Sequence, residues 1–232
     1  MSLNIKAYVM LVLASIFWAG NFIIGKFAFV ESISPFSLVF FRWLTVWFIL
    51  FPFTYKEILS KKKEISNYLP LLLFLGLTSV GLFNSFVYVS LQYTQVINAS
   101  LFNTAIPAAI ILSCFIFKIE KTNFYQLLGL LISVLGILVI ITKFNLNILL
   151  NLDFNIGDIW MIGAVICWGL YSSFLKKLKL KISLLSFVHI VCTCGLIFLL
   201  PQFSYEYFQG NAATIDKTFI YCLIYLALFP SI

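Results

Sequence analysis

Arg42 is the residue with the clearest capacity for chemistry, because it is the only arginine among 232 residues and the only charge well inside an apolar stretch. Counted from Pro35 at 1.5 Å per residue, it lies about 10 Å below the near surface of a membrane. Two interpretations stay open. Arg42 is either a structural anchor that reaches the headgroups, or a counter-ion for an anionic group such as a carboxylate.

Two tryptophans with polar neighbours form the second set of candidate residues. Trp18 and Asn21 share one helical face. Trp168, Tyr171 and Ser172 share another face, about 150 residues later. Aromatic rings from two helices can sandwich an apolar or cationic part of a solute. The alternative is core packing, because aromatic side chains at helical spacing fill any interior.

Polar side chains also occur in two further apolar stretches. Asn84 and Tyr88 lie in the first, beside a stripe of small residues whose alternative role is tight helix packing. Asn98 and Asn103 lie in the second, ahead of Pro107. Proline cannot bond the carbonyl four residues back, so Pro107 leaves the carbonyl of Asn103 free and can hinge the helix. A purely structural kink is the alternative.

Other kinds of chemistry lack the residues that they need. Catalysis requires a nucleophile with a base, paired acids, a metal cluster or a phosphate-binding glycine loop, and the sequence has none of these patterns. We interpret the single histidine, His189, as bonded to a neighbouring helix, with proton relay as the alternative. The apolar stretches contain no buried Asp or Glu, which disfavours a proton-driven cation antiporter. We expect no enzyme activity, no metal and no cofactor.

The elements that position these residues are predicted to be transmembrane helices. The chain is 62% hydrophobic and 10% charged, so it has too few polar residues to cover the surface of a soluble globular protein. A spanning helix needs about 20 mostly apolar residues, which gives seven complete spans and the start of an eighth near Thr218. The complete spans are predicted at residues 7–26, 35–55, 68–91, 95–117, 123–142, 157–176 and 183–200.

The lysines predict the orientation. Most of them fall in loops on the N-terminal side of the membrane, whereas Lys26, Lys143 and Lys217 fall on the other side. The positive-inside rule therefore places the N-terminus in the cytoplasm. The net charge of +7 is thus a topology signal and does not indicate a nucleic-acid partner. The excess of lysine over arginine, with abundant Phe, Ile and Asn, favours a bacterial source.

The chain also repeats itself at half length. Trp18 aligns with Trp168 at an offset of 150, and Ser34 aligns with Ser183 at an offset of 149. Further pairs are Ala14 with Ala164, Lys26 with Lys176, Ile33 with Ile182, Ser37 with Ser186 and Val39 with Val188. Each repeat would hold five spans, an odd number, so the two copies insert upside down relative to each other.

We therefore predict an all-α integral membrane protein with two five-helix repeats, at residues 1–145 and 155–232. The second repeat is interpreted as truncated, because the eighth span is still apolar at Ile232. If the second repeat has the same length as the first, the intact protein has roughly 290 residues and ten spans. Inverted repeats are a recurring construction of secondary carriers, in which two halves give alternating access to one midplane site.

Several local patterns together carry a family resemblance. They are Ala14-Ser15-Ile16-Phe17-Trp18-Ala19-Gly20-Asn21, Ser34-Pro35 followed by Arg42, Asn98-Ala99-Ser100-Leu101 with Pro107, and Gly129 with Gly136. With the spacing of the spans along the whole chain, they resemble a ten-helix EamA-type member of the drug/metabolite transporter superfamily. The resemblance implies an inner-membrane carrier that moves small metabolites, most often outward.

The sequence thus predicts a secondary transporter that exports small metabolites by alternating access. An amino-acid-like solute would satisfy both Arg42 and the paired tryptophans, and other small amphipathic solutes fit as well. A lipid-carrier flippase and a non-transporting membrane scaffold are the alternatives. The expected partners are a small-molecule substrate and the lipid bilayer, and the sequence leaves a homodimer open.

Overall fold

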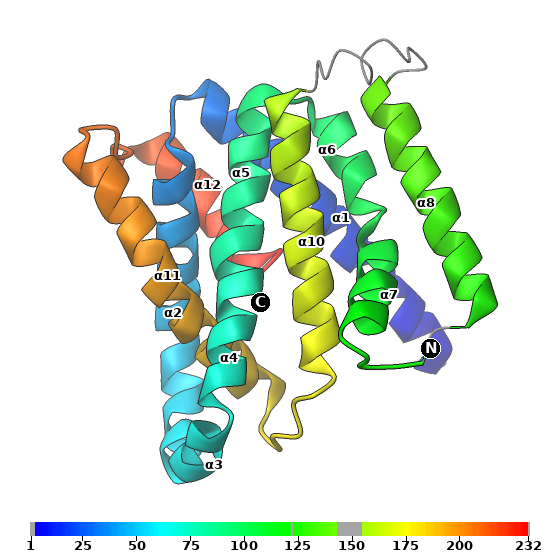
Figure 1. Ribbon diagram of the computed structural model, residues 1–232. Helices are drawn as coiled ribbons and strands as arrows, with labels where there is room; N and C mark the ends of the chain where they lie inside the picture. Colours follow the sequence, from blue (N-terminus) through cyan, green and yellow to red (C-terminus); the bar gives the residue numbers. More distant parts are fainter. Residues whose placement is uncertain (1–2, 122, 143–154, 232) are drawn as a thin grey trace.

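The computed structural model describes residues 3–121, 123–142 and 155–231 as helices joined by short connections (Figure 1). Six of the described helical segments are long and apolar enough to cross a membrane, and two shorter apolar helices accompany them. A helix satisfies its backbone hydrogen bonds internally, as hydrocarbon requires. The described part of the chain is therefore an all-α protein built from membrane-spanning helices.

Helices occupy the position of every predicted span. Three consecutive elements, α4, η1 and α5, form the third span, and α6 and α7 form the fourth. The elements are α1 (Leu3–Val30), α2 (Pro35–Ser60), α3 (Lys62–Asn67), α4 (Leu69–Gly76), η1 (Leu77–Phe83), α5 (Asn84–Tyr93), α6 (Val96–Asn103), α7 (Ile106–Ile116), α8 (Phe124–Thr142), α10 (Ile156–Leu175), α11 (Leu184–Phe208) and α12 (Lys217–Leu228).

Two spans differ from their predictions near prolines. The span predicted at 183–200 continues through Pro201 to Phe208, because one interior proline removes a single backbone hydrogen bond and the helix resumes beyond it. The span predicted at 95–117 is interrupted by a turn just before Pro107, which then occupies the first turn of α7. The interruption agrees with the predicted kink, and a hinge motion there stays a prediction.

The third span contains a π-helix that the sequence does not predict. Its seven residues, Leu77–Phe83, form the wider η1 turn between α4 and α5. Such turns are rare and frequently occur at functional sites. Just before η1, Gly76 lies against α11 so closely that a Cβ there would be 2.7 Å from the backbone nitrogen of Gly195. This close approach fixes the third span against α11.

The helices α2 and α11 lie side by side and run antiparallel (Figure 1). Glu206, near the end of α11, is hydrogen-bonded to the first turn of α2, and Glu57, near the end of α2, is hydrogen-bonded to the first turn of α11. Between these ends, the Cys192 thiol donates to the carbonyl oxygen of Trp43 at 3.1 Å. The pair forms the wall on which the central cavity is built.

Candidate functional site: a cavity around Arg42

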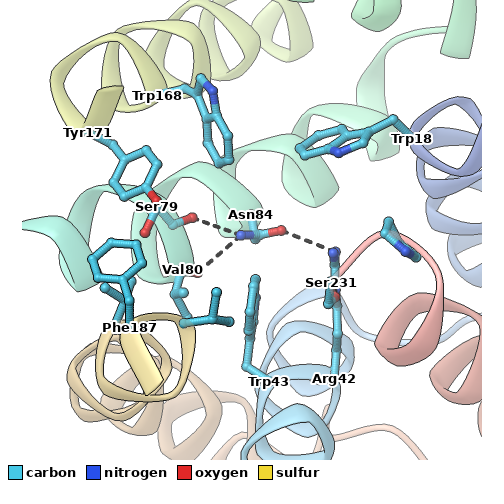
Figure 2. Close-up of a pocket in the computed structure, with 13 residues that line it drawn as sticks. Trp18, Arg42, Trp43, Ser79, Val80, Asn84, Trp168, Tyr171, Phe187 and Ser231 are labelled. Atoms are coloured by element: carbon cyan, nitrogen blue, oxygen red, sulfur yellow. Dashed lines mark hydrogen bonds between the residues drawn. The ribbon is translucent and has the colours of Figure 1, made fainter. Parts of the chain in front are cut away.

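A cavity of about 250 Å³ lies among α1, α2, the third span, α10 and α11 (Figure 2). It is lined by Trp18, Arg42, Trp43, Ser79, Val80, Asn84, Trp168, Tyr171, Phe187, Val188, Val191, Pro230 and Ser231. Among these described residues Arg42 is the only charged one, and none is acidic. The cavity therefore carries a positive charge that its own lining does not neutralise.

The guanidinium of Arg42 points into the bundle, and the residue is only 2% exposed. Its Nη1 donates to Asn21 Oδ1 at 2.9 Å, to Asn84 Oδ1 at 3.1 Å and to Tyr88 Oη at 2.7 Å. Its Nε donates to Ser231 Oγ at 2.8 Å. Every one of these partners is neutral, and Nη2 has no hydrogen-bond partner among the described residues. The Arg42 side chain thus points into the bundle and not out to the headgroups. The Nη2 side of its guanidinium stays available to a ligand.

The π-helix orients the acceptor that Asn84 offers to Arg42. The Asn84 side-chain amide donates to the carbonyl oxygen of Ser79, five residues earlier, at 2.8 Å, which leaves Oδ1 directed at the guanidinium (Figure 2). On the other side, Tyr88 Oη donates to Asn21 Oδ1 at 2.9 Å. Each acceptor of the arginine is therefore held by a second contact, so the charge has a defined position.

An uncompensated buried charge is costly, and neutral hydrogen-bond acceptors offset only part of that cost. A carboxylate or similar group on a ligand would offset more of it. Ion pairs are also stronger in a water-poor interior than in bulk water. The arrangement can therefore bind an anionic group through the free face of Arg42.

An aromatic wall lies across the cavity from Arg42 (Figure 2). The rings of Trp18 and Trp168 meet edge to face with their centroids 5.6 Å apart, and Phe83 lies 4.5 Å from Trp168. Tyr171 continues the wall at 5.1 Å from Trp168. Because the two indoles contact each other, they form one wall and not the predicted sandwich. The wall presents an apolar face to whatever occupies the cavity.

Seven of the ten predicted path residues converge here, and three do not. Asn98 lies with Lys26 in a separate depression at one end of the bundle. Asn103 ends α6, and its buried Oδ1 has no partner among the described residues. Ser172 is half-buried and does not line the cavity. These three share polarity with the others, but none of them lines the cavity around Arg42.

Several lining residues were missed by reasoning from the sequence. Trp43 follows Arg42 directly, and its ring centroid lies 5.2 Å from the guanidinium carbon. An aromatic residue beside the only arginine is a signal that could have found it. Phe187, Val188 and Val191 reach the cavity from α11 and carry no polar signal. Only the packing of α2 against α11 identifies them.

Buried acids are present, which corrects the prediction that the spans lack them. Glu206 and Asp158 are each 8% exposed. Glu206 lies on the part of α11 beyond the predicted span and accepts hydrogen bonds from Ser34 and Ser37. Asp158 lies in the first turn of α10 and accepts from Thr94 Oγ1 at 3.0 Å. Both lie near helix ends, where hydroxyl groups stabilise a carboxylate, and neither lines the central cavity.

Two other polar side chains within the spans hold helices together. The ammonium of Lys26 donates to the carbonyl oxygens of Leu91 at 2.7 Å and Thr94 at 3.1 Å, at the C-terminal end of α5. His189 Nδ1 is hydrogen-bonded to Thr54 Oγ1 on the neighbouring α2, as its interpretation predicted. Lys26 is therefore engaged with backbone, and Arg42 is the cation that faces the cavity.

Comparison with known proteins gives a consistent result over most of the chain. The profile described as the EamA-like transporter family matches residues 5–142 and 155–232. An uncharacterized transporter of Archaeoglobus fulgidus is 29% identical over 231 residues, which cover 99% of this chain and 78% of the relative.

Two further relatives are matched over a smaller share of their length. The uncharacterized transporter YyaM of Bacillus subtilis is 28% identical, over 72% of this chain and 55% of its own length. A WAT1-related protein of Arabidopsis thaliana is 25% identical, over 80% of this chain and 62% of its own length. The chain thus spans little more than half of these two relatives. No solved structure matches it.

Proposed function

Because this chain belongs to the EamA-like transporter family, we propose that it is a secondary transporter for a small solute that carries both an anionic group and an apolar part. The solute is amino-acid-like or another small amphipathic metabolite. It is exported across the bacterial inner membrane by alternating access between two inverted halves, with the N-terminus in the cytoplasm. The observation that carries this proposal is the buried charge of Arg42 in the cavity lining, whose partners among the described residues are all neutral.

The shape of the cavity supports a compact solute. At about 250 Å³ it is below the range of roughly 300–1,000 Å³ that drug-sized ligands occupy. A lipid with two acyl chains does not fit such a volume, so the cavity favours a metabolite over a lipid-carrier substrate. The free face of Arg42 would hold the anionic group, and the wall formed by Trp18, Trp168 and Tyr171 would hold the apolar part.

The proposal is tested by comparing three solutes that differ only at the carboxylate. The product of the complete gene is reconstituted in vesicles, and counterflow is measured with labelled phenylalanine, its amide and phenethylamine. We expect that the compound with the carboxylate is exchanged and that the amide and the amine are not. A smaller amino acid such as leucine or alanine extends the series if phenylalanine is too large for the cavity.

Equal exchange of phenylalanine, its amide and phenethylamine would refute recognition of an anionic group, because the last two lack the carboxylate. Movement of a labelled phospholipid between leaflets, without exchange of any amino acid, would favour the flippase alternative. Vesicles with the Arg42→Gln variant provide the matched control, because any exchange through leaky vesicles persists in them.

A further inference from the structure

One group of side chains occurs twice, at opposite ends of the α2–α11 pair. At the first end, the Glu206 carboxylate accepts the backbone N–H of Phe36 at 3.2 Å and that of Ser37 at 2.8 Å. It also accepts hydrogen bonds from the hydroxyl groups of Ser34 and Ser37. We name Ser34, Ser37 and Glu206 the outer latch, because the predicted orientation places this end outside.

The other end of the pair has the same chemistry with the roles of the helices exchanged. The Glu57 carboxylate accepts the backbone N–H of Ser183 at 2.9 Å. It also accepts hydrogen bonds from the hydroxyl groups of Ser183 and Ser186. We name Glu57, Ser183 and Ser186 the inner latch. In each latch, a glutamate near the end of one helix caps the first turn of the other.

The two latches are related by one sequence offset. Glu206 follows Glu57 by 149 residues, the offset that also relates the two serine pairs. The helix-interior prolines Pro52 and Pro201 obey the same offset, and each lies five residues before its glutamate. An interior proline removes a backbone hydrogen bond and is the commonest place for a helix to bend. Each glutamate therefore lies on a short helical segment that follows a proline, and we call this segment an arm.

The outer latch borders a depression at the outer end of the bundle, and Arg42 of the central cavity lies deeper along the same helix α2. This depression has a volume of about 860 Å³, and Ser34, Phe36 and Glu206 contribute to its lining. Arg42 follows Ser37 by five residues, which places it about 7.5 Å deeper along α2 at 1.5 Å per residue. Release of Glu206 would loosen the first turn of α2 at the depression, about one and a half helical turns above Arg42.

The inner latch adjoins the cavity lining along α11. Ser186 directly precedes Phe187 and Val188, both of which line the cavity from α11. In the middle of the pair, the thiol of Cys192 is bonded to the backbone of Trp43. This contact lies between the two latches and can serve as a pivot when either arm moves.

We propose that the two latches are the alternating gates of the Arg42 cavity. Release of the outer latch opens the cavity to the outside, and release of the inner latch opens it to the cytoplasm. Alternating access requires two openings of similar free energy, since a large difference would hold the protein in one state. Two latches built from the same three side chains, a glutamate and two serines, are suited to that requirement. The proposal rests on the proposed transport function, because it assigns gates to that same cavity.

The test measures from which side the cavity can be reached. A cysteine replaces Ser79 in the cavity lining, and its labelling by a membrane-impermeant thiol reagent is followed in right-side-out and inside-out vesicles that hold the product of the complete gene. Protein without the added cysteine reports labelling of the five native, buried cysteines. The Glu206→Gln and Glu57→Gln variants are compared with Glu64→Gln, which changes an exposed acid on α3.

We expect Glu206→Gln to speed labelling from outside by about tenfold, as the loss of a charge-assisted hydrogen bond implies. Glu57→Gln should speed labelling from inside by a similar factor, and Glu64→Gln should change neither rate. If either glutamine variant fails to fold, Ser37→Ala and Ser186→Ala remove one hydroxyl each and should give smaller shifts in the same opposite directions.

If both glutamine variants speed labelling from the same side, or if their labelling rates equal those of Glu64→Gln, the proposal is overturned. The latches would then be static contacts between α2 and α11. The labelling needs no solute, so the two proposals fail separately. Opposite shifts in a protein that exchanges none of the tested solutes would support the gates and refute the solute assignment. Normal exchange without any shift would refute the gates alone.

Discussion

Replacement of Arg42 by glutamine should remove recognition of the anionic group while leaving the cavity in place. Nη2 of Arg42 has no hydrogen-bond partner among the residues that the structure describes, so it can donate to a carboxylate, and a hydrogen bond to a charged group contributes about 1.5–3 kcal/mol. Because each 1.4 kcal/mol is a factor of ten, the half-saturation concentration for a carboxylate solute should rise about 10- to 150-fold. Inhibition of exchange by the matching amide, which lacks the anion, should change little.

The assay is competition in counterflow, with the acid and its amide measured on the same vesicles. The ratio of their half-inhibition concentrations is the decisive quantity, because a general loss of folded protein changes both alike. The Lys26→Met variant is the matched control, since it removes an inward-facing cation that is bonded to α5 backbone and lies outside the cavity. An unchanged ratio in Arg42→Gln would refute the assignment of Arg42 as the counter-ion.

Three further predictions use the same preparations. Asn84→Asp places a carboxylate beside the guanidinium, where Asn84 Oδ1 now accepts from Nη1 at 3.1 Å, so it should abolish preference for the acid over the amide in the competition assay while the protein stays folded. Trp18→Ala should weaken binding of a solute with an aromatic part by about 0.5–1.5 kcal/mol, a two- to tenfold rise in half-saturation, whereas Trp160→Ala, outside the cavity, should not. Gly195→Ala brings a Cβ to 2.3 Å from a side-chain carbon of the third span and should lower the melting temperature through a cost of about 1–3 kcal/mol. Gly129→Ala, with nothing within 4 Å inside helix α8, should not lower it.

The helix positions followed from the sequence because hydrocarbon imposes both length and composition on a spanning segment. The candidate residues followed from the cost of polarity within such a segment. That rule found Arg42 together with Asn21, Asn84 and Tyr88, which the structure brings into one hydrogen-bonded cluster. It also selected Asn98, which lies elsewhere, because polarity alone does not say toward which neighbour a helix face turns.

The rest depended on tertiary contacts that no local pattern encodes. The π-helical turn that orients Asn84 has no propensity signal, since it forms where the third span packs against α11. Glu206 lies beyond the span predicted at 183–200, because the helix continues through Pro201 to Phe208. The relation of Glu57 to Glu206 was present in the sequence at the same offset as the serine pairs, but its meaning needs the antiparallel contact of α2 with α11.

Protection of a cavity cysteine by solute tests the central claim most directly. The Ser79→Cys variant, with its own exchange rate as reference, is treated with a small thiol reagent in the presence and absence of a saturating carboxylate solute. If the cavity around Arg42 is the transport site, labelling inhibits exchange and the solute slows labelling, with half-protection at its half-saturation concentration. Labelling that inhibits nothing, or that proceeds at the same rate with bound solute, would contradict the account.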